Sequence, residues 1–385
     1  MQIMGRPVDF TCYEFFAGGG MVRAGLGSRW ATPFVNDIDP MKSGAYAENW
    51  GRDGLVTAGV ETLAPEDLPG RADLAWASFP CQDLSLAGSG AGLKGGRSGV
   101  FWAFWSLMRG LKAEGRAPRI IALENVCGLL TSNGGRDFQA LCAALAEDGW
   151  RFGAMVVDAA RFVPQSRPRL FLIAIGADTE LPADLVGAEP SNEWTTPALR
   201  AAIDRLSDEV RARWIHWNPA PPAGAPPVLA DLLEHAPNDA PFLPPEETQR
   251  ILAMMSPAQR KKLAAAKAAG VGAATLFRRT RRNEIGDRVQ RAEARFDGRA
   301  GCLRTPAGGS SRQLVLLLDG PRPRARLLSP RETARLMGLP DSYRLPARAS
   351  AAYKLTGDGV AVPVVSWLAG ALFEPLLDAR AQAAA

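Results

Sequence analysis

The fold is decided by the stretch DFTCYEFFAGGGMVRAGL, which spans residues 9–26. Residues 9–16 are rich in aromatic and β-forming side chains and predict a strand, while residues 21–26 predict a helix. Gly18, Gly19 and Gly20 join the two, because the chain must turn sharply there and let a ligand approach without a Cβ in the way. Together they predict the first unit of an open parallel α/β sheet, whose ligands bind at the carboxyl ends of its strands.

The residues after the glycine turn indicate a ribose-containing ligand other than a dinucleotide. The dinucleotide pattern GxGxxG would place a third glycine at position 23, which holds Arg23. The next apolar segment, residues 33–35, leads to Asp37, about 20 positions after the turn, the spacing at which a carboxylate binds ribose hydroxyls. The alternative is that Asp37 and Asp39 only cap a helix over residues 41–49.

A third apolar segment, residues 72–78, predicts a buried strand that brings Cys81 to the same edge of the sheet. We therefore expect Asp37, Asp73 and Cys81 to share one crevice with the glycine turn. A free cysteine is more often a small, inert hydrophobic residue, so its position alone does not make Cys81 a nucleophile.

Two further charged groups stand at strand ends. The apolar run at residues 119–123 ends in Glu124, a position that suits a general acid. Arg167 and Arg169 alternate with period two, so both can face an anionic or carbonyl-bearing substrate. The alternatives are a helix N-terminal role for Glu124 and solvated surface charge for the arginine pair.

Composition limits the classes of function. The 385 residues are 47% hydrophobic and 22% charged, which fits a large α/β domain with a second lobe. With no secretory signal and no run of about 18 apolar residues, we expect a cytoplasmic protein. Five scattered cysteines without a CxxC pair argue against disulfides and metal sites, and two isolated histidines argue against His-based catalysis. The net charge of +5 favours an anionic partner.

The positive charge is concentrated late in the chain. Residues 271–326 hold thirteen arginines and no lysine, against five acidic residues. Arginine suits bidentate contacts to guanine and phosphate, although arginine-biased composition on a solvated face is the alternative. Upstream, residues 189–227 are predicted to form a connector, and residues 246–269 one or two helices broken near Pro257.

Taken in order, these segments resemble the DNA cytosine-5 methyltransferase family. The resemblance covers residues 9–176 and about 326–376, and the order and spacing of its blocks are more specific than any single block. The blocks are Phe16-Ala17-Gly18-Gly19-Gly20, Asn36-Asp37-Ile38-Asp39, Phe79-Pro80-Cys81-Gln82, Glu124-Asn125-Val126, Gln165-Ser166-Arg167-Pro168-Arg169, residues 326–340, and Gly357-Asp358-Gly359-Val360.

The resemblance implies a Rossmann-like α/β sheet of the S-adenosylmethionine-dependent methyltransferase type. Residues 1–176 would form the catalytic and cofactor-binding domain, and residues 177–325 a smaller target-recognition domain inserted before a C-terminal segment, 326–385, that completes the catalytic domain. The cofactor would be S-adenosyl-L-methionine. Its binding residues would be Phe16, Gly18, Gly20, Asp37, Ile38, Asp73, Leu74, Pro80, Asp358 and Val360, with Asp358 standing where many members carry Asn.

The resemblance also assigns the catalytic roles. Cys81 would add to carbon 6 of a flipped-out cytosine, Glu124 would bind ring N3, Arg169 would hold the base carbonyl and Arg167 would help to position it. No metal is implied.

The implied partner is double-stranded DNA, bound by a monomer, with a cognate restriction endonuclease as a possible second partner and no membrane. Two other functions stay open. One is the related tRNA-methylating branch, against which the arginine-rich region argues; the other is a catalytically inactive DNA-binding homologue, against which Cys81, Glu124, Arg167 and Arg169 together argue.

Overall fold

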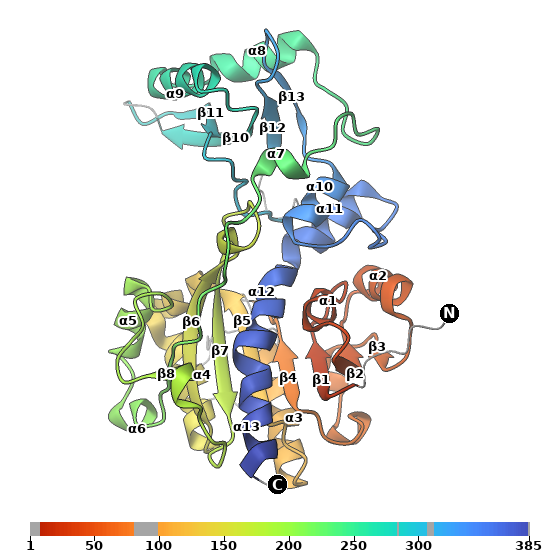
Figure 1. Ribbon diagram of the computed structural model, residues 1–385, viewed down its shortest axis with the longest axis vertical. Coiled ribbons are helices and arrows are strands. Elements are labelled where there is room, and N and C mark those ends of the chain that lie inside the picture. Colours follow the sequence, from red (N-terminus) through yellow and green to blue (C-terminus); the bar gives the residue numbers. More distant parts are fainter. Residues whose placement is uncertain (1–7, 81–98, 283–284, 306–311, 384–385) are drawn as a thin grey trace. The chain divides into compact units, whose positions relative to one another are not determined.

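The computed structural model describes residues 8–80, 99–282, 285–305 and 312–383 (Figure 1). The chain forms two compact units. The first unit comprises residues 1–158, 168–223 and 364–385, and the second unit comprises residues 159–167 and 224–363. The chain therefore passes from one unit to the other four times.

The first unit is built on a seven-stranded sheet with the order β3-β2-β1-β4-β5-β7-β6. The first five strands of the chain run parallel, and β7 is antiparallel to both of its neighbours. The strands are β1 Phe10–Phe15, β2 Trp30–Asn36, β3 Leu55–Val56, β4 Leu74–Ala77, β5 Ile120–Val126, β6 Arg151–Asp158 and β7 Pro168–Ile175. A two-stranded sheet adds β8 Val186–Gly187 and β9 His216–Trp217.

Helices bury both faces of the large sheet. On one face, Phe104 of α3 meets Phe15 of β1 with ring centroids 5.0 Å apart. On the other face, Trp76 of β4 meets Phe373, directly before α13, at 6.3 Å. Because both faces are covered, β4 is apolar and buried throughout. The helices are α1 Met21–Leu26, α2 Pro40–Trp50, α3 Val100–Ala113, α4 Arg136–Glu147, α5 Pro197–Ile203, α6 Asp208–Arg211, α12 Val362–Leu368 and α13 Glu374–Ala383.

The second unit packs short helices against a four-stranded antiparallel sheet with the order β11-β10-β12-β13. Ile251 and Met255, from α8 and the turn after it, share a small core with Leu276 of β10 and Leu316 of β12. The strands are β10 Ala273–Arg282, β11 Arg288–Arg295, β12 Leu314–Leu317 and β13 Arg324–Leu327. The helices are α7 Leu229–Leu232, α8 Pro245–Ala253, α9 Pro257–Ala268, α10 Pro330–Leu336 and α11 Ala349–Asp358.

Local predictions agree with these elements, including the break between α8 and α9, where the Ser256 side chain caps α9. The domain boundaries differ from those expected. Residues 177–223 belong to the first unit, and residues 326–363 belong to the second, as does the segment 159–167. The break near residue 176 was implied by the resemblance, whose first series of blocks ends there, whereas long-range packing decides which segments form each compact unit.

One apolar stretch was not expected. In the described chain, Ala349–Asp378 is long and apolar enough to cross a membrane by length and composition, with a mean hydropathy of 1.7. Of its most apolar window, 61% is buried inside the protein, as is usual for helices that pack in a core.

The contact between Trp76 and Phe373 gives a test of the sheet packing. Phe373 is fully buried, so Phe373→Ala should lower the free energy of unfolding by about 3–5 kcal/mol through lost burial and a cavity. Asp378→Ala, an exposed position on α13, should change it by less than about 0.5 kcal/mol. Urea unfolding followed by tryptophan fluorescence measures both, and equal losses would contradict this packing.

Candidate active site

The glycine turn is held open by a carboxylate from the neighbouring strand. Phe16, Gly18 and Gly20 all have positive φ, of 56°, 59° and 77°. The Gly18 amide donates to Oδ2 of Asp37 over 2.8 Å, and the Asp39 amide donates to Oδ1 of Asp37, also over 2.8 Å. One side chain therefore ties together the loops that follow β1 and β2.

The two acidic residues after β2 have different roles. Asp39 caps α2, because its side chain accepts from the Met41 amide. Asp37 caps no helix and instead binds the glycine turn. The capping alternative therefore holds for Asp39 alone.

Space and apolar surface lie beside Asp37. A Cβ added to Gly18 would meet no atom within 4 Å, so this turn borders open space. Ile38 is 64% exposed, which is unusual for a large aliphatic side chain. A turn without side chains, a carboxylate and an exposed aliphatic face suit a nucleoside-containing ligand.

A polar and aromatic platform that the sequence did not predict lies under this turn. Arg23 donates to the Tyr46 hydroxyl over 2.8 Å, and its guanidinium stands 5.4 Å from the Trp50 ring centroid. Trp50 donates to the Gly19 carbonyl over 3.2 Å. A Cβ on Gly20 would lie 2.4 Å from Trp50 Nε1, so glycine is required there. The residue that breaks the dinucleotide pattern, Arg23, is thus part of the support for the turn.

Glu14 of β1 also belongs to this platform and is fully buried. Burial raises the pKa of its carboxyl to about 8, opposed by the charge of Arg23 and by nearby backbone amides. Neither of its oxygens has a hydrogen-bond partner at normal distance.

At the end of β5, an acid and an amide are held in place. The Glu124 carboxylate pairs with Arg169 of β7, with 3.1 Å between Oε1 and Nε, and both side chains are largely buried. The Asn125 side chain donates to the Phe79 carbonyl over 2.9 Å and accepts from the Val126 amide. Asn125 therefore fixes the chain two residues before Cys81.

Cys81 itself lies outside the described residues. Pro80, the last residue described before it, is exposed, while Phe79 is buried. Gly18, Asp37 and Glu124 lie at the carboxyl ends of β1, β2 and β5, so the structure brings these predicted residues to one edge of the sheet.

Asp73 does not share this edge. It precedes β4 and so stands at the amino end of the sheet, where its Oδ2 accepts from the amide and hydroxyl of Thr11 over 2.9 and 3.0 Å. Arg119 approaches its other oxygen at 3.5 Å. Leu74 follows it as a fully buried core residue. The expected common crevice with Asp37 is wrong for Asp73, because a residue that enters a parallel strand lies opposite the ligand edge.

Arg167 belongs to the second unit and is fully enclosed there. Its guanidinium donates to the carbonyls of Leu303, Gly357 and Gly359 over 2.9, 2.9 and 2.6 Å. It thus joins the chain before residues 306–311 to the end of α11, and no local pattern predicts these contacts.

Asp358 and Val360 stand at that same end of α11. Asp358 accepts a hydrogen bond from the Thr305 hydroxyl, and Val360 is buried.

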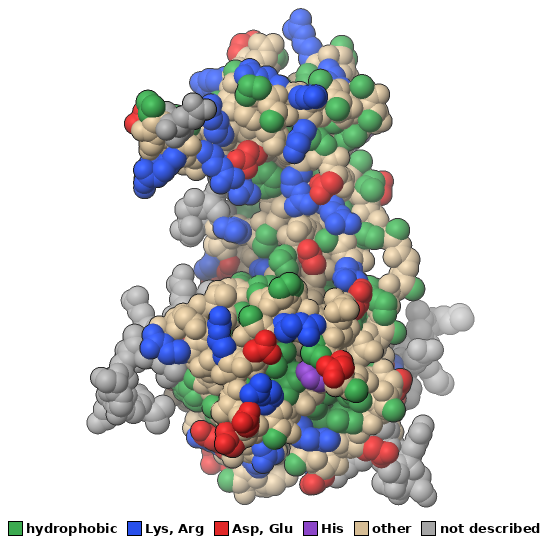
Figure 2. Space-filling view, turned by 90° about the vertical axis from the view of Figure 1, so that its left-hand side faces the viewer, with side chains coloured by type: hydrophobic (Ala, Val, Ile, Leu, Met, Phe, Trp, Pro, Cys, Tyr) green, Lys and Arg blue, Asp and Glu red, His purple; other side chains and the backbone are tan. Residues whose placement is uncertain are grey.

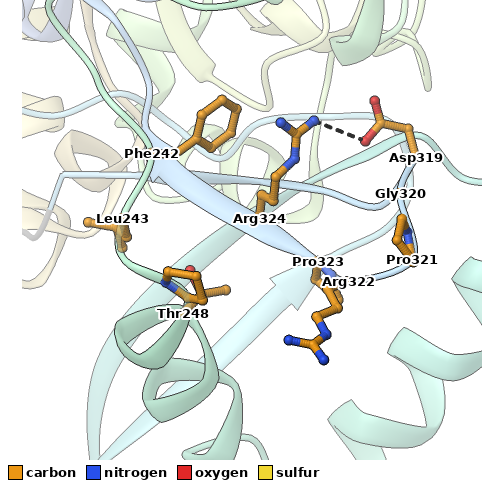
Figure 3. A pocket seen from close by; sticks show the side chains of 10 residues that line it. Phe242, Leu243, Thr248, Asp319, Gly320, Pro321, Arg322, Pro323 and Arg324 are labelled. Atoms are coloured by element: carbon orange, nitrogen blue, oxygen red, sulfur yellow. Dashed lines mark ion pairs between the residues drawn. The ribbon is translucent and has the colours of Figure 1, made fainter.

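The second unit also carries a strongly basic hairpin. Strands β10 and β11 hold seven arginines, and Figure 2 shows Lys and Arg side chains gathered on the part of the surface that this unit forms. A pocket of about 630 Å³ lies at the other edge of the same sheet, beside β13. In it the Arg324 guanidinium covers the Phe242 ring at 4.6 Å and pairs with Asp319 at 3.7 Å (Figure 3).

No group of three or more His, Cys, Asp or Glu that could hold a metal ion occurs among the residues described.

Burial raises the pKa of the Cys127 thiol, which lies close to Glu124 and Arg169 in the folded protein.

Comparison with known proteins places this site in a family. The C-5 cytosine-specific DNA methylase family matches residues 10–374. The type II methyltransferase M.NlaX of Neisseria lactamica is 25% identical over 364 residues, covering 94% of this chain and 95% of that protein. M.HpaII of Haemophilus parainfluenzae is 26% identical over 390 residues, covering 95% and 90%. Among solved structures, the S. pombe Dnmt2 methyltransferase has a TM-score of 0.58 at 18% identity, covering 95% of this chain and 99% of that one.

The sheet and its ligand edge therefore define a methyltransferase fold. The chain belongs to the C-5 cytosine-specific DNA methylase family. It is a DNA (cytosine-5-)-methyltransferase, and its cofactor is S-adenosylmethionine. The open space at Gly18, the Asp37 carboxylate and the exposed Ile38 fit the nucleoside part of that cofactor.

The positions of Asp37 and Asp73 predict different effects of substitution by asparagine, one on cofactor affinity and the other on stability. Asp37→Asn removes a charge that holds the glycine turn, so S-adenosylmethionine should bind about tenfold or more weakly. Asp73→Asn should lower the free energy of unfolding by about 1–2 kcal/mol and leave cofactor affinity unchanged. Calorimetric titration and urea unfolding separate the two effects, and weaker cofactor binding by Asp73→Asn would restore the original expectation.

The buried Glu14 predicts a pH-dependent stability. Its folded-state pKa of about 8 lies above the ordinary value of 4.5, so the folded protein holds this proton over a range in which the unfolded chain has lost it. The stability from this group is complete below pH 4.5 and is lost as pH rises towards 8. Glu14→Gln should therefore gain stability relative to the parent as pH rises from 5 to 8.5, as measured by urea unfolding, and a constant difference would contradict the assignment.

Proposed function

We propose that this protein methylates carbon 5 of one cytosine in a specific duplex DNA sequence, with Cys81 as the nucleophile. The observation that carries the proposal is the end of β5, where Glu124 is held by Arg169 and Asn125 is bonded to Phe79. An acid and the chain that leads to a cysteine are thereby fixed at one strand end.

The chemistry explains why these residue types are needed. Carbon 5 of cytosine is too weak a nucleophile to take a methyl group directly. Addition of the Cys81 thiolate to carbon 6 turns the ring into an enamine-like species that is reactive at carbon 5. This addition builds negative charge on the ring, which Glu124 offsets by a proton or hydrogen bond at N3.

We infer that Arg169 acts on the same base. Its Nε pairs with Glu124, so its guanidinium stands beside the acid that would bind N3, and we infer that it holds the carbonyl oxygen of the base. After methyl transfer, the carbon 5 proton leaves to solvent and Cys81 is eliminated from carbon 6, which restores both the aromatic ring and the thiolate.

S-adenosylmethionine supplies the electrophilic methyl group in this proposal. Phe16, Gly18, Gly20, Asp37 and Ile38 would hold it, and the polar groups of Asp37 would orient its ribose. Pro80, Asp358 and Val360 stay predictions as further contacts, whereas Asp73 and Leu74 lie at the amino end of the sheet, away from the proposed site.

Arg167 takes a positioning role in place of a direct contact with the base. Its guanidinium is buried and bonded to carbonyls at residues 303, 357 and 359. We infer that it fixes the two chain segments that Thr305 and Asp358 also join.

The second unit is proposed to read the DNA sequence through its arginine-rich hairpin. The relatives M.NlaX and M.HpaII are named type II methyltransferases, and we propose that this chain likewise acts as a monomer on DNA in the cytoplasm, alongside a restriction endonuclease of the same specificity. The target cytosine must be flipped out of the duplex to reach the site.

Labelled S-adenosylmethionine, offered with duplex DNA or with tRNA, tests this function. We expect label in DNA, abolished by Cys81→Ala and retained by Cys127→Ala, a second thiol that has no proposed role. Label in tRNA alone would favour the RNA-methylating branch, and no label in either would favour a binding protein without activity.

A covalent assay tests the nucleophile directly. In DNA with 5-fluorocytosine at the target, fluorine cannot leave carbon 5 as a proton does, so the adduct at carbon 6 persists. Gel electrophoresis in SDS should show a stable protein–DNA complex with the parent and Cys127→Ala, and none with Cys81→Ala. A complex that forms with Cys81→Ala would overturn the assignment.

A further inference from the structure

The hairpin of the second unit has one buried and one exposed face. Leu276, Ala292 and Ala294 point to the core, where they are buried against α8 and α9. Side chains alternate along a strand, so the residues between them share the opposite face. That face also carries Thr275 and Val289; its charged and aromatic residues, named here the hairpin basic face, are Phe277, Arg279, Arg281, Arg291, Glu293 and Arg295.

Glu293 is the single acidic residue of this face, and two arginines converge on it. Arg281 binds it in a bidentate manner, with Nε to Oε1 at 2.7 Å and Nη2 to Oε2 at 3.0 Å. Arg279 Nε stands 3.4 Å from Oε2. The hydrogen bond from Arg281 holds the pKa of Glu293 below its usual range, so the carboxylate is charged at neutral pH.

The convergence requires Arg281 to fold back along the hairpin. Its cross-strand partner is Val289, four residues from Glu293 on β11. Without the carboxylate, nothing on the face would draw this side chain towards the base of the hairpin, because the group opposite Arg279 is a second cation, Arg291. Arg279 is further restrained by the Phe277 ring, 5.3 Å from its guanidinium.

The two guanidinium groups remain accessible despite this pairing. Their side chains are 52% and 50% exposed for Arg279 and Arg281. Arg281 uses two of its five donors on Glu293, which leaves the Nη1 side free for an outside acceptor. A fixed guanidinium plane with a free edge is the arrangement that reads guanine in the major groove, whereas phosphate binding needs only a mobile cation.

We propose that Glu293 is a positioning residue for sequence recognition, which holds Arg279 and Arg281 ready to contact base edges and keeps them from binding phosphates indiscriminately. The inference rests on the proposed role of the second unit as the part that reads DNA. The plain structural alternative is that Glu293 only offsets repulsion among the arginines.

The two explanations predict different changes in DNA binding when the Glu293 carboxylate is removed. Glu293→Gln keeps the shape of the side chain but releases both arginines. Two mobile cations should bind phosphates of any duplex, so affinity for unrelated DNA should rise, while the base contacts lose their fixed geometry.

Asp319→Asn provides a matched control. It also removes one negative charge that pairs with an arginine of the same sheet, but its partner is Arg324 on β13, at the opposite edge. Any effect of net charge alone will appear equally in both variants.

The experiment measures dissociation constants of the full-length parent and both variants at several salt concentrations. One short duplex contains the sequence that bisulfite sequencing identifies as methylated by the parent, and the other is a scrambled duplex of the same composition. The ratio of the two constants reports discrimination, and the slope of log affinity against log salt for the scrambled duplex reports phosphate contacts. Thermal unfolding of each variant checks that the fold is intact.

We expect Glu293→Gln to reduce the ratio about tenfold, the size expected for one lost bidentate base contact, and to steepen the salt slope by about one or two units. Asp319→Asn should leave the ratio within about twofold and the slope unchanged. The positioning role of Glu293 is overturned if Glu293→Gln keeps the parent's ratio of dissociation constants, or if Asp319→Asn lowers that ratio equally. Either result leaves the proposed role of the second unit standing. A parent that does not discriminate between the duplexes overturns the proposed role of the second unit as well.

Discussion

The bond between the Gly18 amide and the Asp37 carboxylate is the constraint on which the ligand edge depends. β1 pairs with β2 so that Phe15 lies beside Asn36, and the loops that follow these strands leave the sheet side by side. Positive φ strains the backbone at Phe16, whereas Gly18 and Gly20 adopt it without steric cost, and the Asp37 carboxylate holds the turn through the Gly18 amide. Glu14, Arg23 and Trp50 support the same turn from below. The shape of this ligand edge therefore depends on residues of both strands.

Much of this edge could be predicted from sequence because it depends on local patterns. A strand followed by glycines, and apolar runs that end in Asp37 or Glu124, indicate ligand groups at carboxyl ends of parallel strands. Asp73 shows the limit of that reasoning. It stands at the start of the apolar segment 72–78, so chain polarity alone places it at the amino end, yet it was expected to share the crevice with Asp37. The position of Asp73 at the start of its strand predicts its location in the sheet correctly, whereas the expected cofactor contact does not.

Other features depended on contacts with no local signal. Arg167 and Arg169 are two residues apart, yet one lies in the second unit, bonded to carbonyls more than 130 positions away, and the other pairs with Glu124 in the first. Asn125 was read only as part of a family block, although its side chain fixes Phe79. The bounds of the compact units also differ from the domain bounds that the resemblance implied, because they depend on which distant segments pack together.

Given the role in reading DNA that we propose for it, the discontinuity of the second unit affects how sequence specificity could be exchanged between relatives. Residues 224–363 form one continuous segment of the second unit, which recombination or protein engineering could exchange as a single piece. Yet Gln165 and Arg167, which bond to Leu303, Leu336, Gly357 and Gly359, are encoded upstream of that segment. Four of those bonds are to backbone carbonyls and the fifth is from a backbone amide, main-chain groups that do not depend on the side chains of a replacement sequence. The short segment 159–167 can thus keep its own sequence and still bond to the main chain of an exchanged 224–363 segment.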